Sequence, residues 1–216
     1  MAAQDKTINL AILGCGTVGC GVYNLVERQR DNFVKKIGCQ IEIKKMLVFD
    51  PKTEPEGVDP AILTTDFQEI LSDKGIDIVV ELMDDAHPAK EYLLQAITVG
   101  KHVVTANKDV IAIYGEELFR AAASNNVEVK FEAAVAGGIP VIASLAKSLA
   151  GNDIEEVIGI INGTTNYILT TMAEEGLDYA EAVMEALGSG KTEIDPTEDI
   201  EGLDAAKKCA ILASVA

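Results

Sequence analysis

Apolar runs and amphipathic stretches alternate along the first 150 residues of the chain. Ile8–Leu13 is a short, nearly continuous apolar run, which is typical of a buried strand. In the stretch that follows, apolar residues recur near helical spacing and would give a helix one apolar face: Val18, Val22, Leu25, Val26, Phe33 and Ile37. A strand followed at once by an amphipathic helix is the repeating unit of a parallel sheet.

The same alternation predicts the other elements of this region. Further strands are expected at Ile41–Phe49, Ile76–Leu82, His102–Val104 and Val127–Phe131. Helices are expected around Asp66–Leu71 and at Ala89–Val99 and Ile111–Ala123. Strands that alternate with helices pair in parallel through right-handed crossovers. The pattern therefore predicts an α/β fold with a Rossmann-type doubly wound parallel sheet.

The pattern changes after Gly137–Pro140. A helix-like stretch, the apolar segment Ile154–Ile161 and three helical segments follow. We therefore divide the chain into two domains, 1–140 and 141–216. The apolar helical run Ala210–Ala216 has neither a cap nor a polar tail, so we expect a fragment of a longer protein or a chain completed by a partner.

Composition and charge narrow the classes of function. Hydrophobic residues make up 48% and charged residues 25% of the chain, which is ordinary for a soluble globular protein. No apolar run approaches the ~20 residues that a membrane span needs. The net charge is −17, and residues 151–216 hold 14 acidic side chains against three lysines. Because such a chain is a poor partner for nucleic acid or an anionic membrane surface, we expect neither.

The N-terminal residues and the cysteines indicate in which cellular compartment the protein is found. Residues 1–6 contain no apolar segment of the kind found in secretory signals. The four cysteines are scattered without metal-ligand spacing, which is typical of a reduced chain: Cys15, Cys20, Cys39 and Cys209. We expect a cytoplasmic protein.

The turn after the first strand carries a glycine motif, Gly14-Cys15-Gly16-Thr17-Val18-Gly19. Gly14 permits a tight turn, Gly16 lets the backbone approach a pyrophosphate, and Gly19 lets the helix pack close to the strand. The N–H groups of the helix N-terminus, at Thr17 and Val18, are suited to the phosphates. Because the motif lies between a strand and a helix in a βαβ series, it predicts binding of NAD or NADP rather than a merely structural turn.

Asp50 is the candidate ligand of the cofactor ribose. A carboxylate at the end of the second strand hydrogen-bonds the 2′-hydroxyl of NAD but repels the 2′-phosphate of NADP. Asp50 lies 31 residues after Gly19, further than the usual ~20, which the long helix and loop between them explain. Lys52 could instead serve a 2′-phosphate, and a strand-ending Asp with no ligand remains an alternative.

Thr105-Ala106-Asn107-Lys108 follows the fourth expected strand. The carboxyl ends of parallel strands are where open α/β sheets bind ligands. We therefore expect Thr105 and Lys108 at the cofactor, with Lys108 over the nicotinamide or the substrate. The alternative for Lys108 is an ordinary exposed lysine.

A second cluster of charged residues lies near the end of the chain: Glu193, Asp195, Asp199, Asp204 and Lys208. Asp204 and Lys208 are four residues apart and share one helix face. A lysine among carboxylates can donate a proton while the carboxylates hold an ammonium group. The alternative is an exposed helix ion pair of little consequence.

Together these residues resemble homoserine dehydrogenase, from Ile8 to Ala216. The resemblance rests on five motifs in order: Ile12–Gly19, Gly100–Lys108, Phe131–Pro140, Asn162–Leu169 and Asp195–Lys208. It implies a Rossmann domain followed by the start of an α+β substrate-binding domain. The implied activity is the NAD(P)-dependent interconversion of L-homoserine and L-aspartate 4-semialdehyde, in threonine and methionine biosynthesis. The full-length enzyme is expected to be a homodimer.

The resemblance also implies roles for single residues. Lys208 would protonate the new alkoxide, and Lys108 would lie close to the nicotinamide and the reacting oxygen. Glu193 would bind the substrate ammonium group. Asp204, with Asp199 and Thr164, would shape the site. The family often holds a sodium ion on backbone carbonyls, and the matching positions are Glu132, Val135, Gly137 and Ile139.

Three departures from the family pattern keep alternatives open. Asp84-Asp85 replaces a Gly-Gly pair beside the dinucleotide, Lys191 replaces a tyrosine near the substrate, and Phe49 stands where many NADP-using members have an arginine. Together, Phe49 and Asp50 leave open whether the cofactor is NAD or NADP. They favour NAD or the use of both cofactors. The competing functions are a non-catalytic NAD(P)-binding protein or inactive fragment, and a dehydrogenase of another amino-acid aldehyde.

Overall fold

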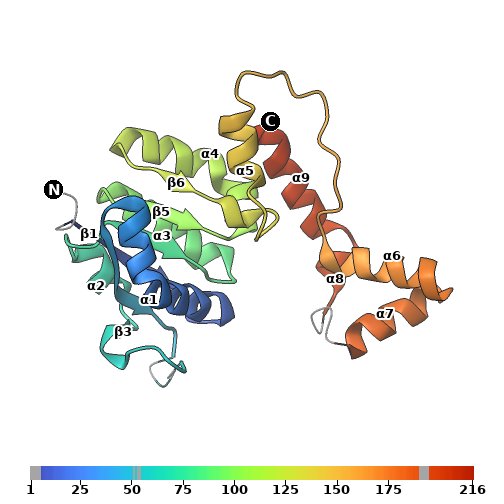
Figure 1. Cartoon of the computed structure of the whole chain (residues 1–216), viewed down its shortest axis with the longest axis horizontal. Helices are drawn as coiled ribbons and strands as arrows, with labels where there is room; N and C mark the ends of the chain where they lie inside the picture. The colour runs from blue at the N-terminus through green and yellow to red at the C-terminus, as the bar shows by residue number, and fades with distance from the viewer. Residues whose placement is uncertain (1–5, 51, 53–54, 190–194) are drawn as a thin grey trace. The chain divides into compact units, whose positions relative to one another are not determined.

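The computed structural model describes residues 6–50, 52, 55–189 and 195–216 (Figure 1). The chain divides into two compact units. Unit 1 ends at Ala134 and unit 2 begins at Val135. Each has a hydrophobic cluster of its own.

Unit 1 contains a parallel sheet of six strands in the order β3-β2-β1-β4-β5-β6. The strands are β1 (Thr7–Leu13), β2 (Gln40–Leu47), β3 (Leu63–Thr64), β4 (Ile78–Glu81), β5 (His102–Thr105) and β6 (Val129–Lys130). This order confirms the doubly wound α/β fold expected from the sequence. The two-residue strand β3 was not expected, because a pair of residues is too short to produce an alternating pattern.

Capping side chains set the N-termini of several helices of unit 1. They are α1 (Thr17–Ile37), η1 (Pro60–Ile62), α2 (Phe67–Ser72), α3 (Ala86–Thr98), α4 (Lys108–Asn125) and η2 (Glu132–Ala134). The side chains of Asp85 and Asn107 accept hydrogen bonds from the first N–H groups of α3 and α4. Both helices therefore begin three residues before the apolar pattern had indicated.

Side chains on both faces of the sheet are buried. Leu10 and Ile12 of β1 pack with Val26 of α1 and Val80 of β4. Side chains alternate between the faces of a strand, so the fully buried neighbours of these residues on β1, Ala11 and Leu13, point to the opposite face. The core of unit 1 thus fixes the carboxyl ends of the central strands.

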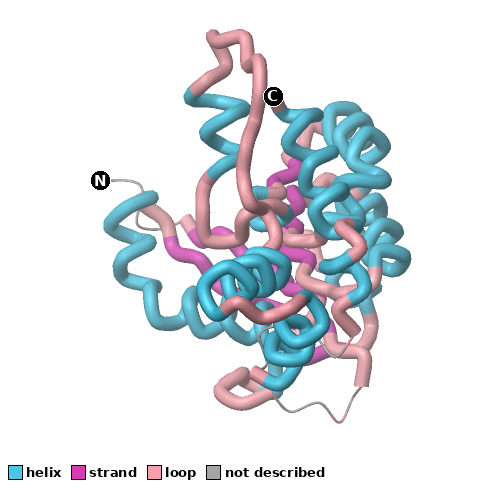
Figure 2. The backbone as a smooth tube through the Cα atoms, turned by 90° about the vertical axis from the view of Figure 1, so that its right-hand side faces the viewer, coloured by secondary structure: helices cyan, strands magenta, loops and turns pink. Residues whose placement is uncertain are grey.

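In unit 2 the described elements are helical. They are α5 (Val141–Ala143), the π-helical turn η3 (Ser144–Ser148), α6 (Gly163–Glu175), α7 (Tyr179–Gly188), α8 (Thr197–Ile200) and α9 (Leu203–Val215). Ile168 of α6 and Ala182 and Ala186 of α7 form a small buried cluster. Among the described residues, the long loop that leads into α6 contains no helix or strand (Figure 2). Ile158 in this loop is 84% exposed.

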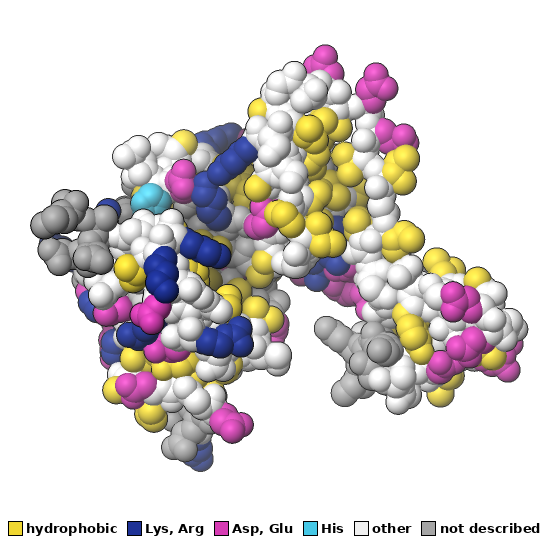
Figure 3. Space-filling view, viewed as in Figure 1, with side chains coloured by type: hydrophobic (Ala, Val, Ile, Leu, Met, Phe, Trp, Pro, Cys, Tyr) yellow, Lys and Arg dark blue, Asp and Glu magenta, His cyan; other side chains and the backbone are white. Residues whose placement is uncertain are grey.

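Charge is unevenly distributed over the surface. On the face of unit 1 that Figure 3 shows, lysine and arginine side chains lie among acidic ones, whereas α6 and α7 carry acidic side chains and neither lysine nor arginine. This matches the excess of carboxylates in the last third of the sequence. None of the described helices combines the length and the apolar composition that crossing a membrane requires.

Candidate dinucleotide and substrate sites

The turns after β1, β4 and β5 meet at one edge of the sheet in unit 1. The Leu82 N–H donates to the Leu13 carbonyl at 2.8 Å, and the Ala106 N–H donates to the Glu81 carbonyl at 3.3 Å. The strand order reverses between β1 and β4, and ligands of open α/β sheets bind at such a switch point. This edge is therefore the candidate dinucleotide site.

The three motif glycines have different surroundings. Gly14 has a φ of +102°, and a Cβ placed there would lie 2.5 Å from the Leu82 carbonyl oxygen. A Cβ on Gly19 would lie 2.2 Å from the Gly14 carbonyl oxygen. A Cβ on Gly16 would meet nothing within 4 Å. Gly14 and Gly19 thus make the turn possible, whereas a side chain on Gly16 would meet open space.

The N-terminus of α1 differs from those of its neighbours. Asp66, Asp85 and Asn107 cap α2, α3 and α4 through their side chains. Gly16, at the corresponding position of α1, provides no side-chain cap. The N–H groups of the first turn, including those of Thr17 and Val18, have no partners within the helix and carry the positive end of its dipole. An anion suits this position.

Two cysteine thiols lie close together at the glycine turn, one in the turn itself and one in α1. The sulfur atoms of Cys15 and Cys20 are 3.6 Å apart. Burial, reinforced by the hydrogen bond to Cys20, raises the pKa of the Cys15 thiol to about 12. Cys15 is therefore neutral at physiological pH and adds no negative charge to the glycine turn.

Asp50 lies three residues after the end of β2 and is exposed. One of its carboxylate oxygens accepts a hydrogen bond from the Lys52 N–H at 2.9 Å. A carboxylate has further lone pairs with which to accept a ribose hydroxyl. The neighbouring Phe49 side chain is also exposed.

A buried hydrogen-bond network that sequence reasoning missed joins the ends of β4 and β5. Glu81, the last residue of β4, is 0% exposed. Its two carboxylate oxygens contact the Met83 N–H at 2.7 Å and the Thr105 hydroxyl at 2.5 Å. Thr105, expected at the cofactor, is thus buried with its hydroxyl bonded to Glu81. Lys108 is the first residue of α4 and is half-buried.

The Asp84-Asp85 pair follows β4, and both residues are exposed. The carboxylate of Asp85 accepts the His87 N–H at 3.0 Å and caps α3. Asp85 therefore occupies the N-terminus of α3, a position that could otherwise attract an anion.

In unit 2, one amide connects two of the expected carboxylates. The Asn162 side-chain NH₂ donates to Asp199 at 2.6 Å and to Asp204 at 2.9 Å. Its carbonyl oxygen accepts the Thr165 N–H at 2.8 Å and caps α6. Asn162 lies within one of the five motifs, but the motif alone predicts no role for it. An Asn directly before Gly-Thr-Thr is an N-cap signature that could have revealed it.

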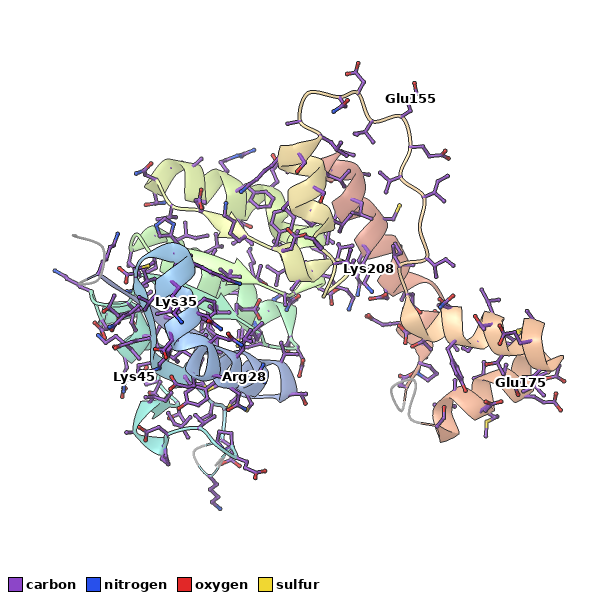
Figure 4. All side chains as sticks on the ribbon, viewed as in Figure 1. Arg28, Lys35, Lys45, Glu155, Glu175 and Lys208 are labelled. Atoms are coloured by element: carbon purple, nitrogen blue, oxygen red, sulfur yellow. The ribbon has the colours of Figure 1, made fainter. Side chains whose placement is uncertain are left out.

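Lys208 belongs to the same cluster. It lies on α9, where Figure 4 labels it. Its Nζ lies 2.7 Å from an Asp204 carboxylate oxygen and donates to the Ile161 carbonyl at 2.9 Å. The side chains of Lys208 and Asp204 are 20% and 9% exposed. The pair is therefore largely buried, in contrast to the exposed ion pair that was the alternative.

The remaining expected residues are only partly described. Thr164 is buried in the first turn of α6. Glu193 and Lys191 lie outside the described residues. Val135 is buried, whereas Gly137 and Ile139 belong to an exposed turn in which the Ile139 N–H donates to the Ala136 carbonyl. Glu132 begins η2 of unit 1. No group of three or more His, Cys, Asp or Glu side chains suited to a metal occurs among the residues with described positions.

The sheet order, the glycine turn and the uncapped helix define the class of unit 1 as a Rossmann-type dinucleotide-binding domain. Residues 14–132 match the family model described as homoserine dehydrogenase, NAD binding domain, and residues 140–216 match the model described as homoserine dehydrogenase. The chain belongs to the homoserine dehydrogenase family.

Individual relatives agree with this assignment. Homoserine dehydrogenase of Bacillus subtilis is 44% identical over 209 residues, which cover 96% of this chain and 48% of the relative. A homoserine dehydrogenase structure from Thiobacillus denitrificans has a TM-score of 0.91 at 44% identity, over 97% of this chain and 48% of that one. A hyperthermophilic archaeal homoserine dehydrogenase in complex with NADPH has a TM-score of 0.85 at 28% identity, covering 97% and 70%. The chain spans about half the length of the curated relatives it matches.

Proposed function

We propose that this chain provides the cofactor-binding region and the proton donor of a homoserine dehydrogenase. The enzyme interconverts L-homoserine and L-aspartate 4-semialdehyde in threonine and methionine biosynthesis. The observation that carries the proposal is the partly buried cluster of Lys208, Asp204, Asp199 and Asn162 in unit 2. Family membership supports the reaction, and the chemistry of the cluster supports the role of each residue.

Unit 1 would bind the dinucleotide, which supplies or accepts the hydride when bound. The N–H groups at the N-terminus of α1 would hold the pyrophosphate, with Gly16 leaving room for it. Asp50 would accept the ribose 2′-hydroxyl and favour NAD over NADP. The archaeal relative that binds NADPH supports use of NADP within the family, so we propose NAD with NADP as a second cofactor.

Unit 2 would supply the proton. In the direction of reduction, hydride adds to the aldehyde carbon and the carbonyl π electrons move onto oxygen. Lys208 gives a proton to this alkoxide and forms the hydroxyl of homoserine, and solvent restores the lysine proton. Two of the three Nζ donors of Lys208 are held by Asp204 and Ile161 in the described structure, which orients the third. Lys108 would lie close to the nicotinamide and the reacting oxygen.

The carboxylates would hold the amino-acid portion of the substrate. Glu193 would bind the ammonium group, while Asp199 and Thr164 would shape the pocket around it. Asp204 would act mainly on Lys208, because its carboxylate is already bonded to that lysine and to Asn162. A negative cluster of this kind suits a substrate that carries an ammonium group.

A sodium ion is a further part of the proposal. Oxygen atoms of Glu132, Val135, Gly137 and Ile139, largely their backbone carbonyls, would form an all-oxygen donor set, which suits a hard cation. The turn that carries these carbonyls has an unusual backbone, since Ala136 has a φ of +56°. The ion would stabilise the segment that joins the two domains, proposed as 1–140 and 141–216.

A homodimeric, cytoplasmic enzyme without nucleic-acid or membrane partners completes the proposal. A non-catalytic NAD(P)-binding protein or inactive fragment is the second candidate, because the negative charge of Asp84 and Asp85 would weaken productive binding of the dinucleotide. A dehydrogenase of another amino-acid aldehyde is the third candidate, because Lys191 replaces a tyrosine that the family usually has near the substrate.

The direct test measures reduction of NAD or NADP by L-homoserine. It uses the 216-residue chain and a chimera in which the C-terminal half of the Bacillus subtilis relative follows Ala216. We expect homoserine-dependent turnover in the chimera, and turnover in the shorter chain if it completes the substrate site alone. Cofactor binding without turnover in either protein would favour the non-catalytic role. Preference for another amino-acid alcohol would favour the third candidate.

A further inference from the structure

Glu81 is a buried acid that takes no part in the proposed reaction. It ends β4, is fully buried, and lies between the apolar residues Val80 and Leu82. Burial, together with the charge of Asp84, raises the pKa of this carboxyl, although its hydrogen bonds act in the opposite direction. A buried acid is unfavourable unless its hydrogen bonds are satisfied, and both oxygens of Glu81 have partners.

The partners of Glu81 belong to two different turns. Met83 lies in the turn after β4, and Thr105 opens the turn after β5. The Thr105 hydroxyl oxygen also accepts the Asn107 N–H at 2.9 Å. The Asn107 side chain in turn donates to the Met83 carbonyl at 3.2 Å, which closes a ring of hydrogen bonds around Glu81.

The ring continues into the start of α4. The Asn107 carbonyl oxygen accepts the N–H groups of Asp109 at 3.1 Å and Val110 at 3.0 Å. Lys108, the first residue of α4, therefore follows directly from a turn that Glu81 holds in place. Loss of the Glu81 carboxyl would leave the buried Met83 N–H and the Thr105 hydroxyl without this partner.

This network lies in one half of the dinucleotide-binding sheet. In doubly wound folds of this order, each half of the sheet binds one mononucleotide, and an acidic residue on the β2 side binds the ribose of adenosine. Asp50 occupies the β2 side in unit 1. The turns that Glu81 joins follow β4 and β5, across the switch point, and therefore belong to the nicotinamide half.

We propose that Glu81 is a positioning residue for the nicotinamide half of the cofactor, because it locks the turns after β4 and β5 together and so fixes the start of α4 with Lys108. This inference rests on the proposed binding of a nicotinamide dinucleotide. It assigns Glu81 no contact with the cofactor itself.

The test compares the affinities of Glu81 variants for NADH and for ADP, which lacks the nicotinamide half. Glu81→Met has a similar length and no hydrogen-bonding group. Its affinity for NADH should fall about tenfold, whereas its affinity for ADP should fall by less than about twofold. Glu81→Gln can accept the Met83 N–H and donate to the Thr105 oxygen, so both affinities should stay within about threefold of wild type.

Val103→Ala is the matched control, since it removes fully buried volume from β5 without touching the network. It should lower the melting temperature and leave both affinities unchanged. If Glu81→Met does not fold, Glu81→Asp, which keeps the charge but is one methylene shorter, should show the same split between NADH and ADP. Equal losses for the two ligands, no loss for either, or a Glu81→Gln variant as weak as Glu81→Met would overturn the inference. Wild-type protein that binds neither ligand would contradict the proposed function instead.

Discussion

At the scale of single residues, Glu81 links protonation to folding. Its pKa in the folded protein lies above the ordinary value of 4.5, so the folded state holds this proton more tightly than the unfolded chain. The contribution of Glu81 to the free energy of unfolding is therefore complete below pH 4.5 and is lost as the pH rises through the folded pKa.

Glu81→Gln has no such proton to lose. Its stability relative to wild type should rise with pH across that window and become constant above it. Urea unfolding of the two proteins at matched pH values measures the difference. A difference that does not change with pH would contradict the raised pKa.

Asn162 is the second buried polar residue that matters at this scale. Asn162→Asp keeps the oxygen that caps α6 but replaces an NH₂ donor with a third carboxylate beside Asp199 and Asp204. We expect a loss of about 2 kcal/mol in the free energy of unfolding at neutral pH. The loss should shrink in acid, where protonated carboxyl groups can donate hydrogen bonds again.

Asn166→Asp serves as the control for this prediction. Asn166 lies on the exposed part of the first turn of the same helix, where a negative charge is tolerated or mildly favourable. Thermal melts of both variants across pH make the comparison. An Asn162→Asp protein as stable as Asn166→Asp at neutral pH would show that the amide does not hold the cluster together.

At the scale of elements, the apolar pattern predicted where strands and helices lie but not how their ends are built. Strand β1 and helix α1 lie close to where their patterns predicted them, although Val18, Leu25 and Ile37 on the expected apolar face of α1 are exposed. The helices α3 and α4 begin earlier than expected, because a capping side chain extends a helix beyond its apolar stripe. Glu81 lies within an expected strand, and a charged residue in a buried strand is itself a signal of a special role.

In the candidate site, too, the sequence predicted the positions of residues but not their long-range contacts. The motifs indicated Lys208 and Asp204, and helical spacing alone brought them to one face. The bond from Lys208 to the Ile161 carbonyl and the bridge through Asn162 join residues that are 37 to 47 positions apart. No local pattern reports such contacts, because they depend on how α6, α8 and α9 pack.

The glycine turn allows an element-scale prediction with a matched control. Gly16 and Gly21 both have open space where a Cβ would stand, and neither has a positive φ. Gly16→Ala should therefore keep its melting temperature but weaken NADH binding about tenfold or more, because the methyl group meets the pyrophosphate. Gly21→Ala, further along α1, should leave both properties unchanged or raise the stability slightly. Calorimetric titration and thermal melts check both variants. Equal affinities for the two variants would place the pyrophosphate elsewhere.

At the scale of the whole molecule, each unit carries one part of the proposed chemistry. Unit 1 has the uncapped helix and the glycine turn, while unit 2 has the lysine among carboxylates. The excess of acidic residues in the last third of the chain agrees with a substrate that carries an ammonium group. The sequence predicted this division of chemistry through its motifs, whereas the buried networks that support each half required the structure.

Lys208 is the proposed proton donor for homoserine dehydrogenase chemistry. The most direct measurement is the rate of homoserine-dependent NAD reduction by the chimera carrying Lys208→Met, compared with the same chimera carrying Lys207→Met. Lys207 is the adjacent lysine, and it pairs instead with Glu198 at 2.9 Å. We expect Lys208→Met to lower turnover at least about 100-fold with NADH affinity nearly unchanged, and Lys207→Met to retain turnover close to wild type. If Lys208→Met turns over homoserine as fast as Lys207→Met, Lys208 is not the proton donor.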